Sequence, residues 1–219
     1  MWKHARRKIP QRRRTSSVRP GDIHTKDVET LKSRALPTEK IILGIDPGTT
    51  VMGFGVLMCE GREARLITAG AIKFPVADDH ALKLRAIFKH VSQIIEEHKP
   101  DELAIEAQFF GKNVQSMLKL GRAQGVAIAA ALHRELAVVE YAPKRIKQSI
   151  TGNGNASKEQ VAAMLLSILQ LRSLPASTDA TDAVAVALCH HFCGTGQLSP
   201  ARKSKDWGAF LRNNPERVI

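Results

Sequence analysis

Three short β-rich segments follow one another closely between residues 41 and 74, and they leave few folds open to this chain. The segments are Ile41 to Asp46, Val51 to Cys59 and Ala64 to Phe74. The gaps between them hold residues that favour tight turns, first Pro47-Gly48-Thr49-Thr50 and then Glu60-Gly61-Arg62. This pattern predicts an antiparallel meander of three strands.

Helical and strand patterns alternate after the meander. Apolar residues at helical spacing predict a helix from Asp79 to His98. A buried strand, an alanine-rich helix, a fifth strand and two more helices are then predicted at Glu102 to Ala107, Asn113 to Leu136, Ala137 to Tyr141, Ser157 to about Leu171 and Thr178 to Phe192. The segment from Pro143 to Asn155 is basic and then glycine-rich, and no helix is predicted there. The order β-β-β-α-β-α-β-α-α predicts an α/β fold, a mixed five-stranded sheet flanked by helices.

The two ends of the chain differ from this domain, which we place at residues 40–192. Residues 1–39 contain prolines, the run Arg12 to Arg14 and no apolar periodicity, which is typical of a disordered basic arm. Residues 193–219 read as a polar C-terminal tail, in which Trp207, Phe210 and Leu211 are candidates for a short docked helix. One folded domain between two loosely held ends is therefore expected.

Positive charge is concentrated in two parts of the sequence. The whole chain has 33 basic and 21 acidic side chains, a net charge of +12. Residues 1–40 contribute 12 basic and 4 acidic side chains, and residues 107–158 contribute 8 basic and 2 acidic ones. A basic half of this kind suits a polyanionic partner such as a nucleic acid.

Apolar runs and cysteines bear on the cellular compartment. The longest nearly unbroken apolar run, Val126 to Leu132, is much shorter than the roughly 18 residues of a membrane span. The N-terminus has charge but no apolar stretch behind it, so no secretory signal is predicted. The 3 cysteines, Cys59, Cys189 and Cys193, are an odd number that makes no disulfide framework. We expect a soluble protein of the reducing cytoplasm without a membrane partner.

Four carboxylates lie at the ends of predicted elements. Asp46 ends the first strand, Glu106 ends the fourth, and Asp179 and Asp182 stand three apart in the first turn of the last helix. Taken singly, an aspartate at such a position also suits a turn or a helix cap. Glu106, however, ends a buried strand, where an unpaired charge is costly. Gathered carboxylates favour a hard divalent cation, Mg²⁺ or Mn²⁺, and predict a site for phosphoryl transfer.

Several separated motifs in this chain resemble the RuvC family of Holliday-junction resolvases. They are Ile45-Asp46-Pro47-Gly48-Thr49-Thr50, Ala104-Ile105-Glu106, Lys112-Asn113, Leu118-Lys119-Leu120-Gly121 and Asp179-Ala180-Thr181-Asp182-Ala183. The resemblance covers about residues 41–192. It implies a ribonuclease H-like fold, a homodimer, and Mg²⁺-dependent symmetric cleavage of four-way junction DNA in recombination and repair. It also implies that Asp46, Glu106, Asp179 and Asp182 are the catalytic and metal-binding acids, with two metal ions per site, and that RuvA and RuvB are partners.

The same resemblance extends to the basic half of the domain. It implies DNA contacts at Lys147 and Lys158, and an aromatic side chain at Phe109 that stacks on bases at the junction. Lys112, Lys119, Arg122 and Arg145 complete the predicted DNA-binding set. The alternative is that the lysines are ordinary surface residues and that Phe109 is a packing residue beside a strand.

Three other functions share part of this pattern. Actin-like kinases and chaperone ATPases begin with a similar aspartate turn, but this chain is too short for their second domain. A ribonuclease H-like nuclease that processes ribosomal RNA precursors and a non-catalytic DNA-binding module remain as alternatives. Cleavage of a four-way junction compared with single-stranded RNA discriminates among them.

Overall fold

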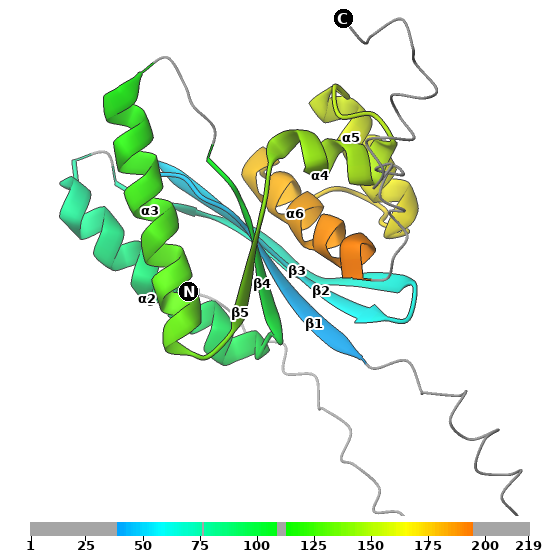
Figure 1. Ribbon diagram of the computed structural model, residues 1–219, viewed down its shortest axis with the longest axis horizontal. Helices are drawn as coiled ribbons and strands as arrows, with labels where there is room; N and C mark the ends of the chain where they lie inside the picture. The colour runs from blue at the N-terminus through cyan, green and yellow to red at the C-terminus, as the bar shows by residue number, and fades with distance from the viewer. Residues whose placement is uncertain (1–38, 76, 109–112, 195–219) are drawn as a thin grey trace, which may run out of the picture. The chain divides into compact units, whose positions relative to one another are not determined.

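A single five-stranded sheet forms the centre of the domain in the computed structural model, which describes residues 39–75, 77–108 and 113–194 (Figure 1). The strands are β1 (Lys40–Asp46), β2 (Val51–Glu60), β3 (Glu63–Lys73), β4 (Glu102–Glu106) and β5 (Ala137–Tyr141). Their order across the sheet is β3-β2-β1-β4-β5. β1, β2 and β3 pair in antiparallel fashion, whereas β4 and β5 are parallel to β1. The predicted meander and mixed sheet are both confirmed.

Helices cover both faces of this sheet (Figure 1). One face carries α2 (His80–His98) and α3 (Val114–His133), and the other carries α4 (Pro143–Thr151), α5 (Lys158–Ile168) and α6 (Thr178–Gly194). Each face has its own apolar core. Within the described residues, no helix is both long enough and apolar enough to cross a lipid bilayer.

Alternation along the strands decides which face each side chain joins. In β1, Leu43 and Ile45 pack into the core under α2 and α3, while Ile42 packs into the core under α4, α5 and α6. In β4, Leu103 and Ile105 face the first core and Ala104 faces the second. Since side chains on a strand alternate with period two, the even-numbered acids at the ends of β1 and β4 emerge on the α6 face.

Helix starts follow capping rules visible in the sequence. Asp79 Oδ1 accepts a hydrogen bond from Leu82 N at 2.7 Å, so α2 begins where predicted. Ser157 and Gln160 form a complete capping box at the start of α5. Two helices end earlier than predicted. α3 ends at His133 rather than Leu136, and α5 ends at Ile168 rather than Leu171.

Helix α4 is the main correction to the sequence-based assignment. The segment from Pro143 was expected to lack a helix, yet Pro143 occupies a first-turn position and Gly152 closes the helix in the left-handed conformation, with φ of 75°. Only Ile146 and Ile150 supply buried apolar side chains over these nine residues. So short a repeat of apolar residues gives little helical signal among lysines and arginines.

Helix α6 lies unusually close to β1 and β2. A Cβ atom added at Gly53 would stand 1.9 Å from the carbonyl oxygen of Asp179, and one at Gly44 would stand 2.2 Å from the carbonyl oxygen of Ala183. The missing side chains therefore let the N-terminal half of α6 approach the strands at backbone distance. This close packing sets where the acids of α6 stand relative to the end of β1.

Candidate active site

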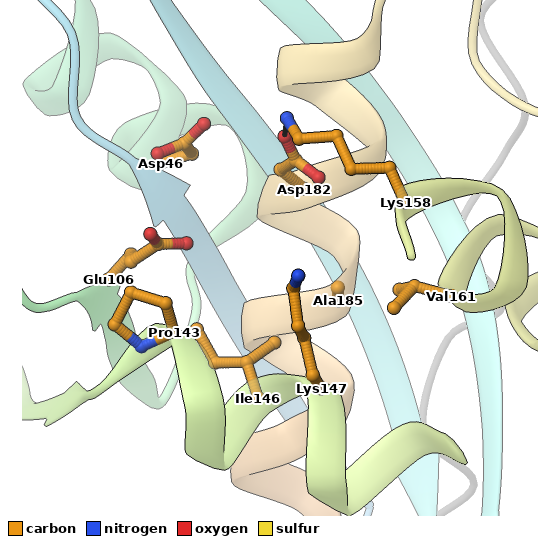
Figure 2. A pocket seen from close by; sticks show the side chains of 9 residues that line it. All are labelled: Asp46, Glu106, Pro143, Ile146, Lys147, Lys158, Val161, Asp182 and Ala185. Carbon is orange, nitrogen blue, oxygen red and sulfur yellow. Dashed lines mark hydrogen bonds and ion pairs between the residues drawn. The ribbon is translucent and has the colours of Figure 1, made fainter. Parts of the chain in front are cut away.

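Two parallel strands bring Asp46 and Glu106 together at one edge of the sheet. Ile45 pairs with Ile105, so the two acids are the next residues in register at the carboxyl ends of β1 and β4. Both side chains emerge on the α6 face, and Figure 2 shows them on one side of a common cavity. From the sequence, the carboxylates at the ends of elements were expected to be able to converge, and the pairing of β1 with β4 brings these two together.

Helix α6 adds the third carboxylate from the opposite wall. Asp182 faces Asp46 and Glu106 across a cavity of about 220 Å³, which is also lined by Pro143, Ile146, Lys147, Lys158, Val161 and Ala185 (Figure 2). The apolar members of this lining come from α4, α5 and α6, and the sequence offered no signal for them. Three of the four predicted acids therefore border one cavity.

Asp179 is placed differently from the other three acids. It lies in the first turn of α6, does not line the cavity, and accepts a hydrogen bond from the hydroxyl of Ser177 at 2.9 Å. Its negative charge nevertheless contributes to raising the pKa of Asp46. Asp179 thus stands within electrostatic reach of the cavity, with its carboxylate turned to the helix N-terminus.

Burial and like charge dominate the electrostatics of Asp46 and Glu106. Burial, followed by the negative charges of Glu106, Asp182 and Asp179, raises the pKa of Asp46 to about 7. Burial and the charge of Asp182 also raise the pKa of Glu106. In the part of the chain that the structure describes, neither carboxylate receives a hydrogen bond or forms an ion pair. Both acids are therefore held in a site that disfavours their charge.

Two lysines supply the positive charge in this cavity. Lys158, at the first position of α5, donates from Nζ to Asp182 Oδ2 at 2.6 Å (Figure 2). That hydrogen bond, with the nearby acids, raises the pKa of Lys158. Lys147 projects from α4 into the same cavity, and its charge partly offsets the raised pKa of Glu106. The two lysines predicted to contact DNA thus stand directly beside the predicted acids.

The donor set in this cavity matches a hard divalent cation. Carboxylate oxygens are the ligands that Mg²⁺ and Mn²⁺ prefer, and the cavity borders on three of them. Among the residues described, no three histidine, cysteine, aspartate or glutamate side chains stand close enough together to ligate one ion as they are.

The other predicted DNA contacts lie farther from the acids. Lys119 and Arg122 are exposed on α3, on the opposite side of the sheet from α6. Arg145 directs its guanidinium to the thiol of Cys193, at 3.8 Å, near the far end of α6 from Asp182. Phe109 and Lys112 fall outside the described residues.

A second polar cluster, which the sequence analysis did not predict, occupies the other end of β4. His190 Nε2 meets a carboxylate oxygen of Glu102, and His190 Nδ1 lies 2.7 Å from the hydroxyl of Tyr141. Lys40 forms an ion pair with the other oxygen of Glu102. Burial would raise the pKa of Glu102, but the hydrogen bonds from Lys40 and His190 outweigh it and lower that pKa. These residues are far apart in the sequence, so no local pattern reveals the cluster.

Comparison with a family model and with curated proteins identifies the family of this chain. A family model described as crossover junction endodeoxyribonuclease RuvC matches residues 42–190. The RuvC protein of Cytophaga hutchinsonii is 56% identical over 181 residues, covering 82% of this chain and 88% of its own. That of Bacteroides fragilis is 56% identical over 182 residues, covering 82% and 96%.

Solved structures show the same likeness. The T. thermophilus RuvC in complex with a Holliday junction substrate is 33% identical, with a TM-score of 0.69 over 72% of this chain and 96% of its own. The yeast mitochondrial Holliday junction resolvase Ydc2, at 13% identity and a TM-score of 0.56 over 83% of this chain and 90% of its own, shares the fold.

Proposed function

This chain belongs to the RuvC family of crossover junction endodeoxyribonucleases, and from that premise we propose that it resolves Holliday junctions by symmetric hydrolysis of their phosphodiesters in recombination and repair. The observation that carries the proposal is the cavity where Asp46, Glu106 and Asp182 meet Lys147 and Lys158. Acids that hold a cation, beside ammonium groups that attract phosphate, are the parts a metal-dependent nuclease needs. The fold is ribonuclease H-like, with a mixed five-stranded sheet between two layers of helices.

We assign catalysis and metal binding to four acids, Asp46, Glu106, Asp179 and Asp182. The RuvC-like nuclease fold implies dependence on a divalent metal, and we propose two Mg²⁺ ions per site, with Mn²⁺ as the alternative. Such ions, when bound, activate water and neutralise charge on the scissile phosphate. The raised pKa of Asp46 and Glu106 supports this assignment, because a bound cation would stabilise the charged form of these unpaired acids.

The basic side chains divide into two groups in this proposal. Lys147 and Lys158 contact the DNA backbone beside the scissile phosphate, where their ammonium groups border the cavity. Phe109 is assigned a separate role, stacking on bases at the junction, and Lys112 is assigned a DNA contact, both by family resemblance. Lys119, Arg122 and Arg145, which lie farther from the acids, form the second group. Of these, Arg145 has its guanidinium engaged with Cys193, so its DNA contact requires that side chain to turn.

An exposed apolar stripe on α3 supports a homodimer. Val114, Leu118 and Leu132 are 67%, 51% and 58% exposed, and they share one side of the helix with Gly121 and Gly125. A Cβ atom at either glycine would meet nothing within 4 Å, so the stripe is unfilled along its middle. We propose that two copies pack through this stripe about a two-fold axis, which suits a four-way DNA of matching symmetry.

The domain boundaries are proposed from the sequence. Residues 40–192 form the catalytic domain, with residues 1–39 as a basic arm and residues 193–219 as a polar tail. The family resemblance supports RuvA and RuvB as partners and the cytoplasm as the compartment.

Cleavage by the purified full chain tests the proposal. In Mg²⁺, a four-way junction should be cut at two symmetric positions, whereas linear duplex and single-stranded RNA should stay intact. Asp46→Asn should still bind the junction but not cut it, since the change removes a ligand oxygen's charge and keeps the volume. Cleavage of the RNA instead would favour the RNA-processing nuclease, and junction binding without cleavage by the wild type would favour a non-catalytic module.

A further inference from the structure

The ion pair between Lys158 and Asp182 stands between two cavities. One is the active-site cavity, and the other, of about 230 Å³, is lined mainly by apolar groups that include Ala162, Leu174 and Pro175. Lys158 and Asp182 border both. The Lys158 side chain is 67% exposed and that of Asp182 is 26% exposed, so the ammonium can leave its partner without crossing a packed core.

The backbone that carries Lys158 is held in place while its side chain is not. Ser157 N donates to Gln160 Oε1 at 2.9 Å, and Gln160 N donates to Ser157 Oγ at 3.2 Å, which closes the first turn of α5. Exchange of partners by Lys158 therefore needs only side-chain rotation. Such rotamer changes are fast compared with binding and catalysis.

Asp182 differs from its neighbours in having a positive partner. Of the three carboxylates that border the active-site cavity, only Asp182 forms an ion pair within the described part of the chain. Lys147 borders the same cavity and forms no ion pair with any described residue. A cation that approaches Asp182 must therefore displace Lys158, whereas Lys147 presents no such obstacle.

We propose that Lys158 exchanges between Asp182 and the DNA backbone, so that divalent-cation binding and junction binding promote each other. The inference builds on the proposed function. A cation at Asp182 releases the ammonium for a phosphate, and a phosphate that draws Lys158 away frees Asp182 for the cation. Because coupling between two ligands is reciprocal, each must raise the affinity of the other by the same factor. Lys158 is in this sense a positioning residue for Asp182 before the cation arrives.

Two measurements on the full chain test this exchange, with Lys147→Met as a control matched in charge and size. First, thermal unfolding without DNA is followed against Mg²⁺ concentration. Lys158→Met should show the same rise in Tm above its own Mg²⁺-free value at about threefold lower Mg²⁺ than Lys147→Met, since the ammonium that competes for Asp182 is gone. Lys158→Gln is the second variant if the methionine disturbs folding.

Second, junction affinity is measured by fluorescence anisotropy with and without Ca²⁺, with a gel to verify that the junction stays intact. Ca²⁺ should raise the affinity about fivefold in the wild type and in Lys147→Met. The increase should fall below about twofold in Lys158→Met and return in Lys158→Arg.

Equal coupling in Lys158→Met and Lys147→Met, or equal rises in Tm of the two variants at every Mg²⁺ concentration, would overturn the exchange. That failure is distinct from failure of the proposed function, because a wild type that cuts junctions would still be a resolvase. A wild type that neither binds nor cuts junctions would overturn both.

Discussion

Glu102 and Glu106 stand four residues apart on the same face of β4, and α6 covers both of them with opposite consequences. At the start of the strand, Lys40 and His190 bind the carboxylate of Glu102 and lower its pKa. At the end of the strand, burial and the charge of Asp182 raise the pKa of Glu106. Since strand and helix are shared, the difference lies in the partners: α6 presents His190 to one glutamate and Asp182 to the other.

This contrast shows how one scaffold separates a structural acid from a functional one. The charge of Glu102 is satisfied within the chain and stabilises the packing of α6 on β4. The charge of Glu106 is left unsatisfied, at a cost that a cation can offset. The partly buried carboxylate at one end of β4 has charged partners within the chain, and the one at the other end lacks them. Such an unsatisfied charge is typical of functional sites.

Exchanging the two carboxylates for amides gives the largest expected effect. Glu106→Gln should lower the rate of junction cleavage by about a thousandfold or more, because it removes a charge that holds the cation. Glu102→Gln should change the rate by less than about threefold when assayed well below its unfolding temperature, since its site lies outside the cavity. Single-turnover cleavage assays at matched folded concentration measure both, and similar losses in the two variants would erase the contrast.

Protonation of Asp46 should dominate the pH dependence of the free energy of unfolding. Its pKa is about 7 in the folded protein and 3.8 in the unfolded reference. Between these values the folded state holds a proton that the unfolded state has lost, so the free energy of unfolding falls as pH rises from about 4 to about 7. Asp46→Asn should remove up to about 4 kcal/mol of this fall. Urea unfolding in EDTA across this range measures it, and parallel curves for wild type and variant would contradict the assignment.

Stability at neutral pH should change in opposite directions at the two ends of β4. Glu102→Gln should lower the free energy of unfolding by about 1–3 kcal/mol, because His190 and Lys40 lose a charged, partly buried partner. Glu106→Gln should raise it in EDTA, because a repelled and buried charge is removed. Chemical unfolding of both variants beside the wild type measures the two signs, and destabilisation by both would mean that Glu106 has a structural partner.

The smallest effect is expected from a single lysine of the cavity. Lys147→Ala should reduce the slope of log affinity for the junction against log salt by about one, as for one lost phosphate contact. Lys89→Ala, an exposed lysine on α2 across the sheet, should leave the slope unchanged. Binding titrations at several salt concentrations measure both slopes. An unchanged slope for Lys147→Ala would make Lys147 an ordinary surface lysine.

The sequence predicted the elements whose signals are local. Turn residues delimited β1, β2 and β3, apolar periodicity placed α2, and Ser157 marked the start of α5. The positions of Asp46 and Glu106 at strand ends indicated that they could converge. Contacts between residues far apart in the sequence were not predicted. The cluster around Glu102 joins residues 40, 102, 141 and 190, and the two isoleucines of α4 pack into the core under α4, α5 and α6. The ion pair of Lys158 with Asp182 likewise spans 24 positions.

The contact of α6 with the glycines of β1 and β2 has a consequence for how this protein can diverge. Apolar side chains of the two cores can exchange for others of similar volume, because each swap is absorbed by its neighbours. Gly53 and Gly44 have no such freedom, since a single added methyl group would meet a carbonyl oxygen of α6. Contact between the backbones of α6 and the two strands therefore sets the distance from Asp46 to the acids of α6. Among homologues of this enzyme, we expect most buried apolar residues to be substituted, while both of these positions remain glycine.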